Sequence, residues 1–293
     1  MTYPLPDPRL ALLVLTLVNL LWGGSLPATK LGLREFAPFL LAWLRLALSS
    51  LLFLTALGLR GDLRRLTAAD WRALLGLGLL GYGGTIGLQT LGTAGTTGAS
   101  AAVLGSTGPL AIALLAPLIL GERPGRQTLL GLLLALAGVA LVLGLDPRDL
   151  ATDRLSGDLL VLMSAACFAA LAVLGKGTMA RHPPLVVSGV TAVGGALGLF
   201  PLALVDLAHG LPQPGPLGWS VVVYLGGLIT FVGMVAWFWA LRVVPAARGG
   251  AFLFLQPVSG VALAALVLGD QLTPLFLVGT ALVMVGLALA ARD

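Results

Sequence analysis

The sequence predicts an all-α membrane protein of ten transmembrane helices, arranged as two inverted five-helix repeats over residues 1–150 and 151–293. The first observation is composition, since 58% of the residues are hydrophobic and 10% are charged, against roughly 25% charged residues in a soluble domain. The second is the spacing of the charges, which leaves apolar runs of about 20 residues, enough to cross roughly 30 Å of hydrocarbon. The third is an internal repeat.

Ten apolar runs are long enough to span a bilayer. We place helices at residues 10–29, 38–59, 71–91, 98–120, 126–145, 157–176, 185–205, 218–241, 248–269 and 273–291. The connectors are short and carry helix breakers such as Pro147 and Pro212, so successive helices are expected to be close neighbours. The first run has no clear small-residue cleavage site, and we interpret it as a retained helix.

The internal repeat relates the two halves at an offset of 148 residues. It pairs Trp71 with Trp219, Gly78 with Gly226, Pro109 with Pro257, Gly131 with Gly279, and Gly138 with Gly286. The first and sixth helices fit less tightly and end at Lys30 and Lys176, at an offset of 146. Because each copy holds five spans, an odd number, the second copy is expected to enter the membrane upside down relative to the first.

The distribution of Lys and Arg predicts the orientation. With the N-terminus in the cytoplasm, twelve basic residues near the span ends lie on the cytoplasmic side and four lie outside. The connector before Trp71 carries three arginines, whereas its counterpart before Trp219 carries no Lys or Arg, as expected if the two connectors face opposite compartments. We therefore predict a multi-pass protein of a bacterial-type inner membrane with both termini in the cytoplasm.

The sparse ionisable residues argue against several classes of site. The basic residues lie between apolar runs and form no stripe, so no nucleic-acid partner is expected. Two histidines and the single Cys167 give poor support for a zinc site or a Ser-His-Asp triad, and we expect no cofactor. A membrane-embedded enzyme for lipid substrates stays the least favoured alternative, because such enzymes usually cluster His, Asp or Arg at one membrane face.

Polar and amphipathic side chains within the predicted spans are the candidates for a solute site. They are Trp22, Ser25, Tyr82, Gln89, Ser164, Trp237, Trp239 and Gln256. A buried Tyr, Trp or Gln normally seeks a hydrogen-bond partner, so a lipid-facing position would leave these groups unpaired. Helix packing explains any one of them equally well, and the prediction therefore concerns the set.

Matching prolines, Pro109 and Pro257, fall within the fourth and ninth helices. A proline frees a backbone carbonyl and bends the helix, so both residues are expected either to shape the bundle or to line a solute path. Ser106 precedes the first proline and Gln256 precedes the second, which brings polar groups toward the middle of the membrane.

Charged residues in or beside the spans are the candidates for gating. Arg45 is the sole ionisable residue well inside a span, where a charge is costly unless it is paired or hydrated. It is expected to snorkel or to bind backbone carbonyls, and a gating role or an anionic solute contact is the alternative. Glu122 and Asp270 end equivalent helices on opposite faces and are interpreted as gate or surface residues. Since no Asp or Glu lies deep in a span, coupling through a buried carboxylate is not expected.

The order of these motifs resembles the drug/metabolite transporter superfamily, in its ten-helix EamA-domain branch. The first copy carries Leu21-Trp22-Gly23-Gly24-Ser25 ending at Lys30, then Arg45, then Pro109 to Gly121-Glu122-Arg123, Gly131 and Gly138. The second copy repeats Pro257 to Gly269-Asp270, Gly279 and Gly286 but opens without the Trp-Gly pattern. The resemblance implies a central cavity lined chiefly by helices one, three, four, six, eight and nine.

The chain is most similar in appearance to the aromatic amino-acid exporters of that branch. The resemblance implies an aromatic cavity built from Trp22, Tyr82, Phe168, Phe231 and Trp237. We predict a secondary transporter, not an enzyme, that exports neutral or aromatic amino acids or related metabolites by alternating access, as a monomer or homodimer among membrane lipids. Proton-coupled efflux of cationic drugs is an alternative, and a sugar-phosphate carrier would need more basic groups than Arg45 alone.

Overall fold

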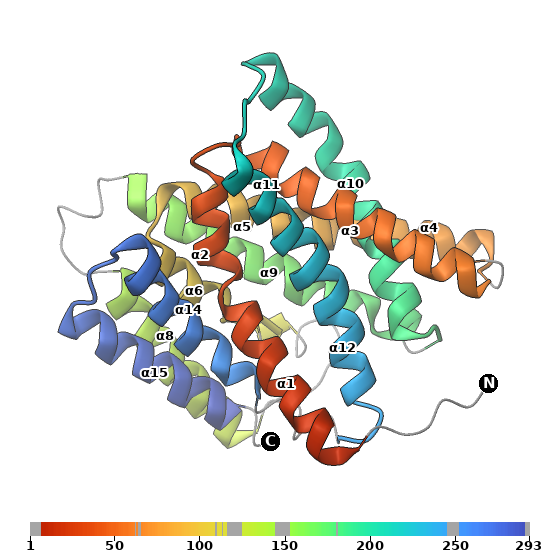
Figure 1. The fold of residues 1–293 in the computed structure, drawn as a ribbon. Helices are drawn as coiled ribbons and strands as arrows, with labels where there is room; N and C mark the ends of the chain where they lie inside the picture. The colour runs from red at the N-terminus through yellow and green to blue at the C-terminus, as the bar shows by residue number, and fades with distance from the viewer. Residues whose placement is uncertain are drawn as a thin grey trace.

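The computed structural model describes residues 7–290 except positions 62, 64, 65, 109, 113, 116–124, 144–152, 180 and 245–251. Every regular element in these residues is a helix, in agreement with the predicted fold class (Figure 1). Pro109 and Glu122, which the sequence singles out, lie outside the described residues.

The first half of the chain contains eight described helical elements. They are α1 (Pro8–Gly23), α2 (Ser25–Gly32), α3 (Pro38–Arg60), α4 (Ala68–Leu77), η2 (Gly78–Gly83), α5 (Gly84–Gly95), α6 (Gly98–Gly105) and α8 (Arg126–Leu143). Local signals set several ends. A capping box between Thr67 and Asp70 begins α4, and Gly61 ends α3 with a φ of 68°, a conformation that glycine adopts without steric cost.

The second half contains the remaining elements. They are α9 (Asp153–Met179), α10 (Pro184–Ala208), α11 (Pro216–Val222), η4 (Val223–Val232), α12 (Gly233–Ala240), η5 (Phe252–Phe254), α14 (Leu255–Leu263), η6 (Ala264–Leu268) and α15 (Pro274–Ala290). Prolines at the first turns of α10 and α11 fit positions whose N–H groups need no helical partner. Asp270 follows η6, where Gly269 adopts a left-handed conformation with a φ of 74°.

Within the part of the chain that the structure describes, seven helical segments are long and apolar enough to cross a membrane. They are Pro8–Gly32, Pro38–Arg60, Ala68–Gly95, Arg126–Leu143, Arg154–Gly175, Pro184–Ala208 and Pro216–Ala240. Two shorter apolar helices cover Leu255–Leu268 and Pro274–Leu289. The molecule is therefore a multi-pass membrane protein.

Irregular helix geometry interrupts two of the long segments. The sequence predicts continuous helices at 71–91 and 218–241, whereas the structure inserts the π-helical segments η2 and η4 in them. A further break separates α1 from α2 at Gly24. π-helical turns inside α-helices occur frequently at functional sites, because they alter the direction of nearby side chains.

Glycines allow the helices to approach closely. The α8 and α15 helices lie side by side (Figure 1), and a Cβ added at Gly138 would lie 2.6 Å from the carbonyl oxygen of Gly279. A Cβ at Gly286 would lie 2.5 Å from the carbonyl oxygen of Gly131. In lipid no hydrophobic effect drives helices together, so this close backbone packing supplies much of the attraction between them.

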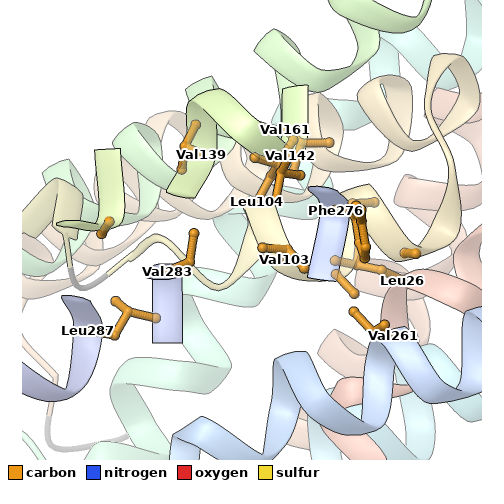
Figure 2. Packing of buried hydrophobic residues seen from close by; sticks show 14 of the residues in the cluster. Leu26, Val103, Leu104, Val139, Val142, Val161, Val261, Phe276, Val283 and Leu287 are labelled. Atoms are coloured by element: carbon orange, nitrogen blue, oxygen red, sulfur yellow. The ribbon is translucent and has the colours of Figure 1, made fainter. Parts of the chain in front are cut away.

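The largest cluster of buried hydrophobic residues joins both halves of the chain. Figure 2 shows Val142 of α8 beside Val161 of α9 and Leu104 of α6, while Val283 and Leu287 lie further along α15. The same cluster continues through Val161 of α9, Phe276 of α15, Val261 of α14 and Leu26 of α2. This packing fixes α2, α6 and α14, which border the cavity described next.

Candidate functional site: a central cavity

A cavity of about 200 Å³ lies among helices from both halves of the chain. Its walls come from α1, α2, α3, η2, α5, α6, α9, η4, α12 and α14. Seven residues that the sequence suggested for solute binding lie in its lining: Trp22, Ser25, Tyr82, Gln89, Ser106, Phe168 and Gln256. The fold thus brings together polar and aromatic groups from segments more than 200 residues apart.

Four of the residues that the sequence suggested for the solute site lie outside the lining, and one of them, Trp239, packs against the buried cluster around Leu15 and Ala240. The Ser164 hydroxyl is buried and donates to the carbonyl oxygen of Val161 over 2.6 Å. Phe231 packs edge-on against Phe53, with ring centroids 4.9 Å apart. Trp237 packs against Trp22 at 5.4 Å, so it supports a wall of the cavity without forming part of it.

Arg45 of α3 lines the cavity and is 7% exposed. Its Nε donates to the Thr230 hydroxyl over 3.1 Å, and its Nη1 donates to the Ser25 hydroxyl over 3.3 Å. The expectation that this side chain snorkels or binds backbone carbonyls is therefore wrong, because it reaches two side-chain hydroxyls inside the protein. Among the described lining residues Arg45 is the one ionised group, and no carboxylate accompanies it.

The break between α1 and α2 is held in place by η4 of the other half. The Trp22 indole Nε1 donates to the carbonyl oxygen of Ile229 over 2.9 Å. The Tyr224 hydroxyl donates to the carbonyl oxygen of Leu21 over 2.7 Å. These bonds join the end of α1, just before the break, to η4, and Ser25 at the start of α2 lies beside Arg45.

Thr230 takes its place from the π-helical geometry of η4. Its hydroxyl donates to the carbonyl oxygen of Leu225, five residues earlier, over 2.7 Å. The Thr230 hydroxyl oxygen also accepts the hydrogen bond from the Arg45 Nε. A continuous α-helix would offer a carbonyl four residues earlier, so the wider turn sets the direction in which this hydroxyl faces.

Gln256 of α14 is oriented by a buried asparagine of α1. The Gln256 Nε2 donates to the Asn19 Oδ1 over 2.9 Å, and the Asn19 Nδ2 donates to the carbonyl oxygen of Leu15 over 2.7 Å. Asn19 is fully buried, and buried polar groups are normally paired in this way. The side chain of Gln256 therefore has a fixed direction at the edge of the cavity.

Polar contacts tie several helices together beyond one end of the cavity. The Lys30 ammonium donates to the carbonyl oxygens of Thr93, Ala94 and Thr96, over 2.9, 2.9 and 2.6 Å. It thereby ties α2 to the end of α5. The Asp270 carboxylate accepts a hydrogen bond from the Ala99 backbone N–H over 2.8 Å, which joins the η6–α15 connector to α6.

Comparison with known proteins gives the family. Residues 9–144 and residues 155–292 each match the EamA-like transporter family. The chain belongs to this family. The resemblance seen in the sequence motifs is thereby confirmed, and the protein is a transporter.

Individual relatives of this EamA-family transporter match almost its whole length. It is 26% identical over 280 residues to an uncharacterised transporter of Archaeoglobus fulgidus, covering 96% of this chain and 98% of that one. It is 29% identical over 280 residues to a probable terminal-alkyne amino-acid exporter of Streptantibioticus cattleyicolor, covering 96% and 92%. A solved crystal structure at 23% identity has a TM-score of 0.65 and covers 96% of both chains, which indicates a shared fold.

Sequence reasoning missed part of the cavity of this EamA-family chain. Thr85, Ile86, Ile229, Thr230 and Met234 line it but carry no pattern that separates them from other apolar or small residues of their helices. Only the Trp22-Gly23-Gly24-Ser25 run signals the helix break. Among the residues that the structure describes, no group of three His, Cys, Asp or Glu side chains is arranged to hold a metal ion.

Proposed function

We propose that this EamA-family transporter exports neutral, chiefly aromatic, amino acids or related small metabolites through the central cavity. The observation that carries the proposal is the cavity itself, which is about 200 Å³ and has Trp22, Tyr82 and Phe168 in its walls. Drug-sized ligands occupy pockets of roughly 300–1,000 Å³, so this volume favours a metabolite. The similarity to a probable amino-acid exporter supports the same substrate class.

We propose further that the chain has ten spans in two inverted repeats, which supply the two halves for alternating access. The seven long apolar segments, the two shorter ones and the residues at 98–120 make up this number. Glycine contacts support the inversion. Gly131 and Gly138 match Gly279 and Gly286 in sequence, and in space Gly138 meets Gly279 while Gly131 meets Gly286. This exchange of partners is expected across a two-fold axis.

A second exchange of contacts supports the same axis. Gly78 lies against the backbone carbonyl oxygen of Thr191. In the matching contact, a Cβ added at Gly226 would lie 2.7 Å from the carbonyl oxygen of Arg45. Gly78 and Gly226 are 148 residues apart, and Arg45 and Thr191 are 146 apart, which are the two offsets of the sequence repeat. The π-helical segments η2 and η4 also fall at matching places.

We propose that both termini lie in the cytoplasm and that the Lys30 end faces outward in the inner membrane. In this orientation the bonds of Lys30 and Asp270 close the outer end of the cavity, as an exporter requires while it loads from the cytoplasm. Reporter fusions near residues 62 and 210 test the arrangement. They should report opposite compartments, and the same compartment for both would overturn the inverted topology.

Cationic drugs fit this cavity poorly. Arg45 places a positive charge in the lining, and the described lining offers no carboxylate to offset it. Two like charges 4 Å apart repel by about 4 kcal/mol at an effective dielectric constant of about 20. Proton-coupled drug efflux therefore lacks the acidic group that it needs at this site.

Reconstitution into proteoliposomes tests the proposed function. Purified protein should exchange labelled phenylalanine or tryptophan for unlabelled amino acid inside the vesicles, at rates well above those of empty vesicles. The variant Phe168→Ala should change the relative rates of the aromatic and aliphatic amino acids, because Phe168 is a cavity wall. As a matched control, Phe200→Ala removes a ring that is 43% exposed outside the lining and should leave those rates unchanged. Absence of protein-dependent flux for every amino acid in a full panel would refute the proposal.

A further inference from the structure

The charge of the central cavity points to one chemical group on the solute. We propose that Arg45, together with the Ser25 and Thr230 hydroxyls, forms a subsite for a carboxylate, so that a carboxylate is the group every good substrate must carry. The inference rests on the proposed function, since it assumes that solutes pass through this cavity. It goes further by naming which group of the solute is required and which is dispensable.

The buried charge of Arg45 has no charged partner in the cavity lining that the structure describes. A guanidinium is ionised at every physiological pH, and a charge deep in a membrane protein is normally paired or coordinated. Arg45 is 93% buried in α3, yet its hydrogen-bond partners are the two neutral hydroxyls of Ser25 and Thr230. No Asp or Glu occurs among the described residues of the lining. The cavity thus presents a net positive charge to whatever enters it.

The N–H donors that Arg45 does not use within the protein suit a planar anion. A guanidinium has five N–H donors, and the bonds to Thr230 and Ser25 use one on Nε and one on Nη1, which leaves both N–H groups of Nη2 and one of Nη1. Planar carboxylates are the anions that the remaining fork of donors matches best, by two parallel hydrogen bonds. The Thr230 hydroxyl donates its one hydrogen bond to the Leu225 carbonyl oxygen, so toward Arg45 it acts as an acceptor that holds the guanidinium in place. Ser25 accepts from Arg45, and its proton is available to a bound anion.

The rest of the described lining suits an aromatic body but holds no counter-ion for an amine. Trp22, Tyr82 and Phe168 offer apolar faces, and Gln89 and Gln256 offer neutral amides. An ammonium group can be accommodated by amide oxygens and aromatic faces, but it gains no ion pair there. A carboxylate without an amino group should therefore bind, whereas an amine without a carboxylate should not.

Substrate analogues test the subsite on the wild-type protein. In vesicles that exchange labelled phenylalanine, unlabelled 3-phenylpropionate should compete, while phenylalanine amide and phenethylamine should compete at least tenfold more weakly. A hydrogen bond to a charged group corresponds to about 10- to 100-fold in affinity, which sets this expectation. Equal competition by the acid, the amide and the amine would overturn the inference while leaving transport itself in place. Absence of exchange of any amino acid would instead overturn the proposed function.

Variants separate charge recognition from structural support. Arg45→Gln should weaken competition by 3-phenylpropionate about 10- to 100-fold and remove the preference for acid over amide, whereas Arg45→Lys should keep part of that preference. Arg34→Gln is the matched control, because Arg34 is an exposed cation outside the lining. A purely structural role predicts lower flux with an unchanged preference, and that result in Arg45→Gln would refute the subsite. If Arg45→Gln fails to fold, the wild-type analogue series and Arg45→Lys still decide the question.

Discussion

Replacing Lys30 with methionine should loosen the end of the cavity that we propose faces outward. The Lys30 ammonium holds three carbonyl oxygens at the end of α5, at 2.6–2.9 Å. These carbonyls lie at a helix terminus and have few other partners within the helix. Methionine keeps the length and the apolar stem of the side chain but donates no hydrogen bond, so α2 loses its polar connection to α5.

The size of the effect follows from these bonds. One hydrogen bond to a charged group contributes about 1.5–3 kcal/mol. The three bonds share one ammonium at a partly exposed edge, where water replaces part of what is lost, so we take about 2 kcal/mol for the set. If the bonds exist only in the outward-closed state, Lys30→Met shifts the equilibrium toward the outward-open state by about 30-fold.

Thiol accessibility in intact cells measures this shift. Ser106→Cys in a Cys167→Ala background places a single thiol in the lining of the cavity. Adding Lys30→Met should raise its reaction rate with a membrane-impermeant reagent by at least tenfold, and Arg34→Met should have little effect. An unchanged rate in a correctly folded Lys30→Met protein would refute the role of Lys30 in closing the outer end.

Two further predictions concern stability and packing. Gly138→Ala should lower the melting temperature of the detergent-solubilised protein, because the new Cβ would press on the α15 backbone, whereas Gly76→Ala, which has open space around it, should leave the melting temperature unchanged or raise it slightly. An equal response of the two variants would contradict the packing described for α8 and α15. Asn19→Leu should cost about 1–3 kcal/mol in unfolding free energy by leaving the Gln256 amide without its partner, and unfolding in denaturant that matches the wild type would contradict this.

The sequence predicts the architecture well where the physical signal is strong. Long apolar runs are visible in composition alone because lipid requires them, and the all-helical, multi-pass class follows directly. Matched glycines such as Gly131 and Gly279 are visible because close helix packing tolerates few other residues. The cavity could be predicted in part, because Tyr82, Gln89 and Gln256 are polar or amphipathic groups in apolar surroundings.

The remaining features depend on three-dimensional contacts that hydropathy does not encode. The π-helical segment that turns Thr230 toward Arg45 lies in an unbroken apolar run. Phe231, its neighbour in sequence, consequently faces Phe53 and not the cavity. Lys30 is predicted only as the residue that ends a helix, and its carbonyl partners become available through the placement of α5 beside α2.

Protection of the cavity by solute tests the central claim most directly. The rate at which a thiol reagent modifies Ser106→Cys, in a Cys167→Ala protein that retains transport, should fall as phenylalanine is added. Half-maximal protection should occur near the concentration that gives half-maximal transport. A modification rate that is independent of phenylalanine in a protein that transports it would show that the solute takes another path.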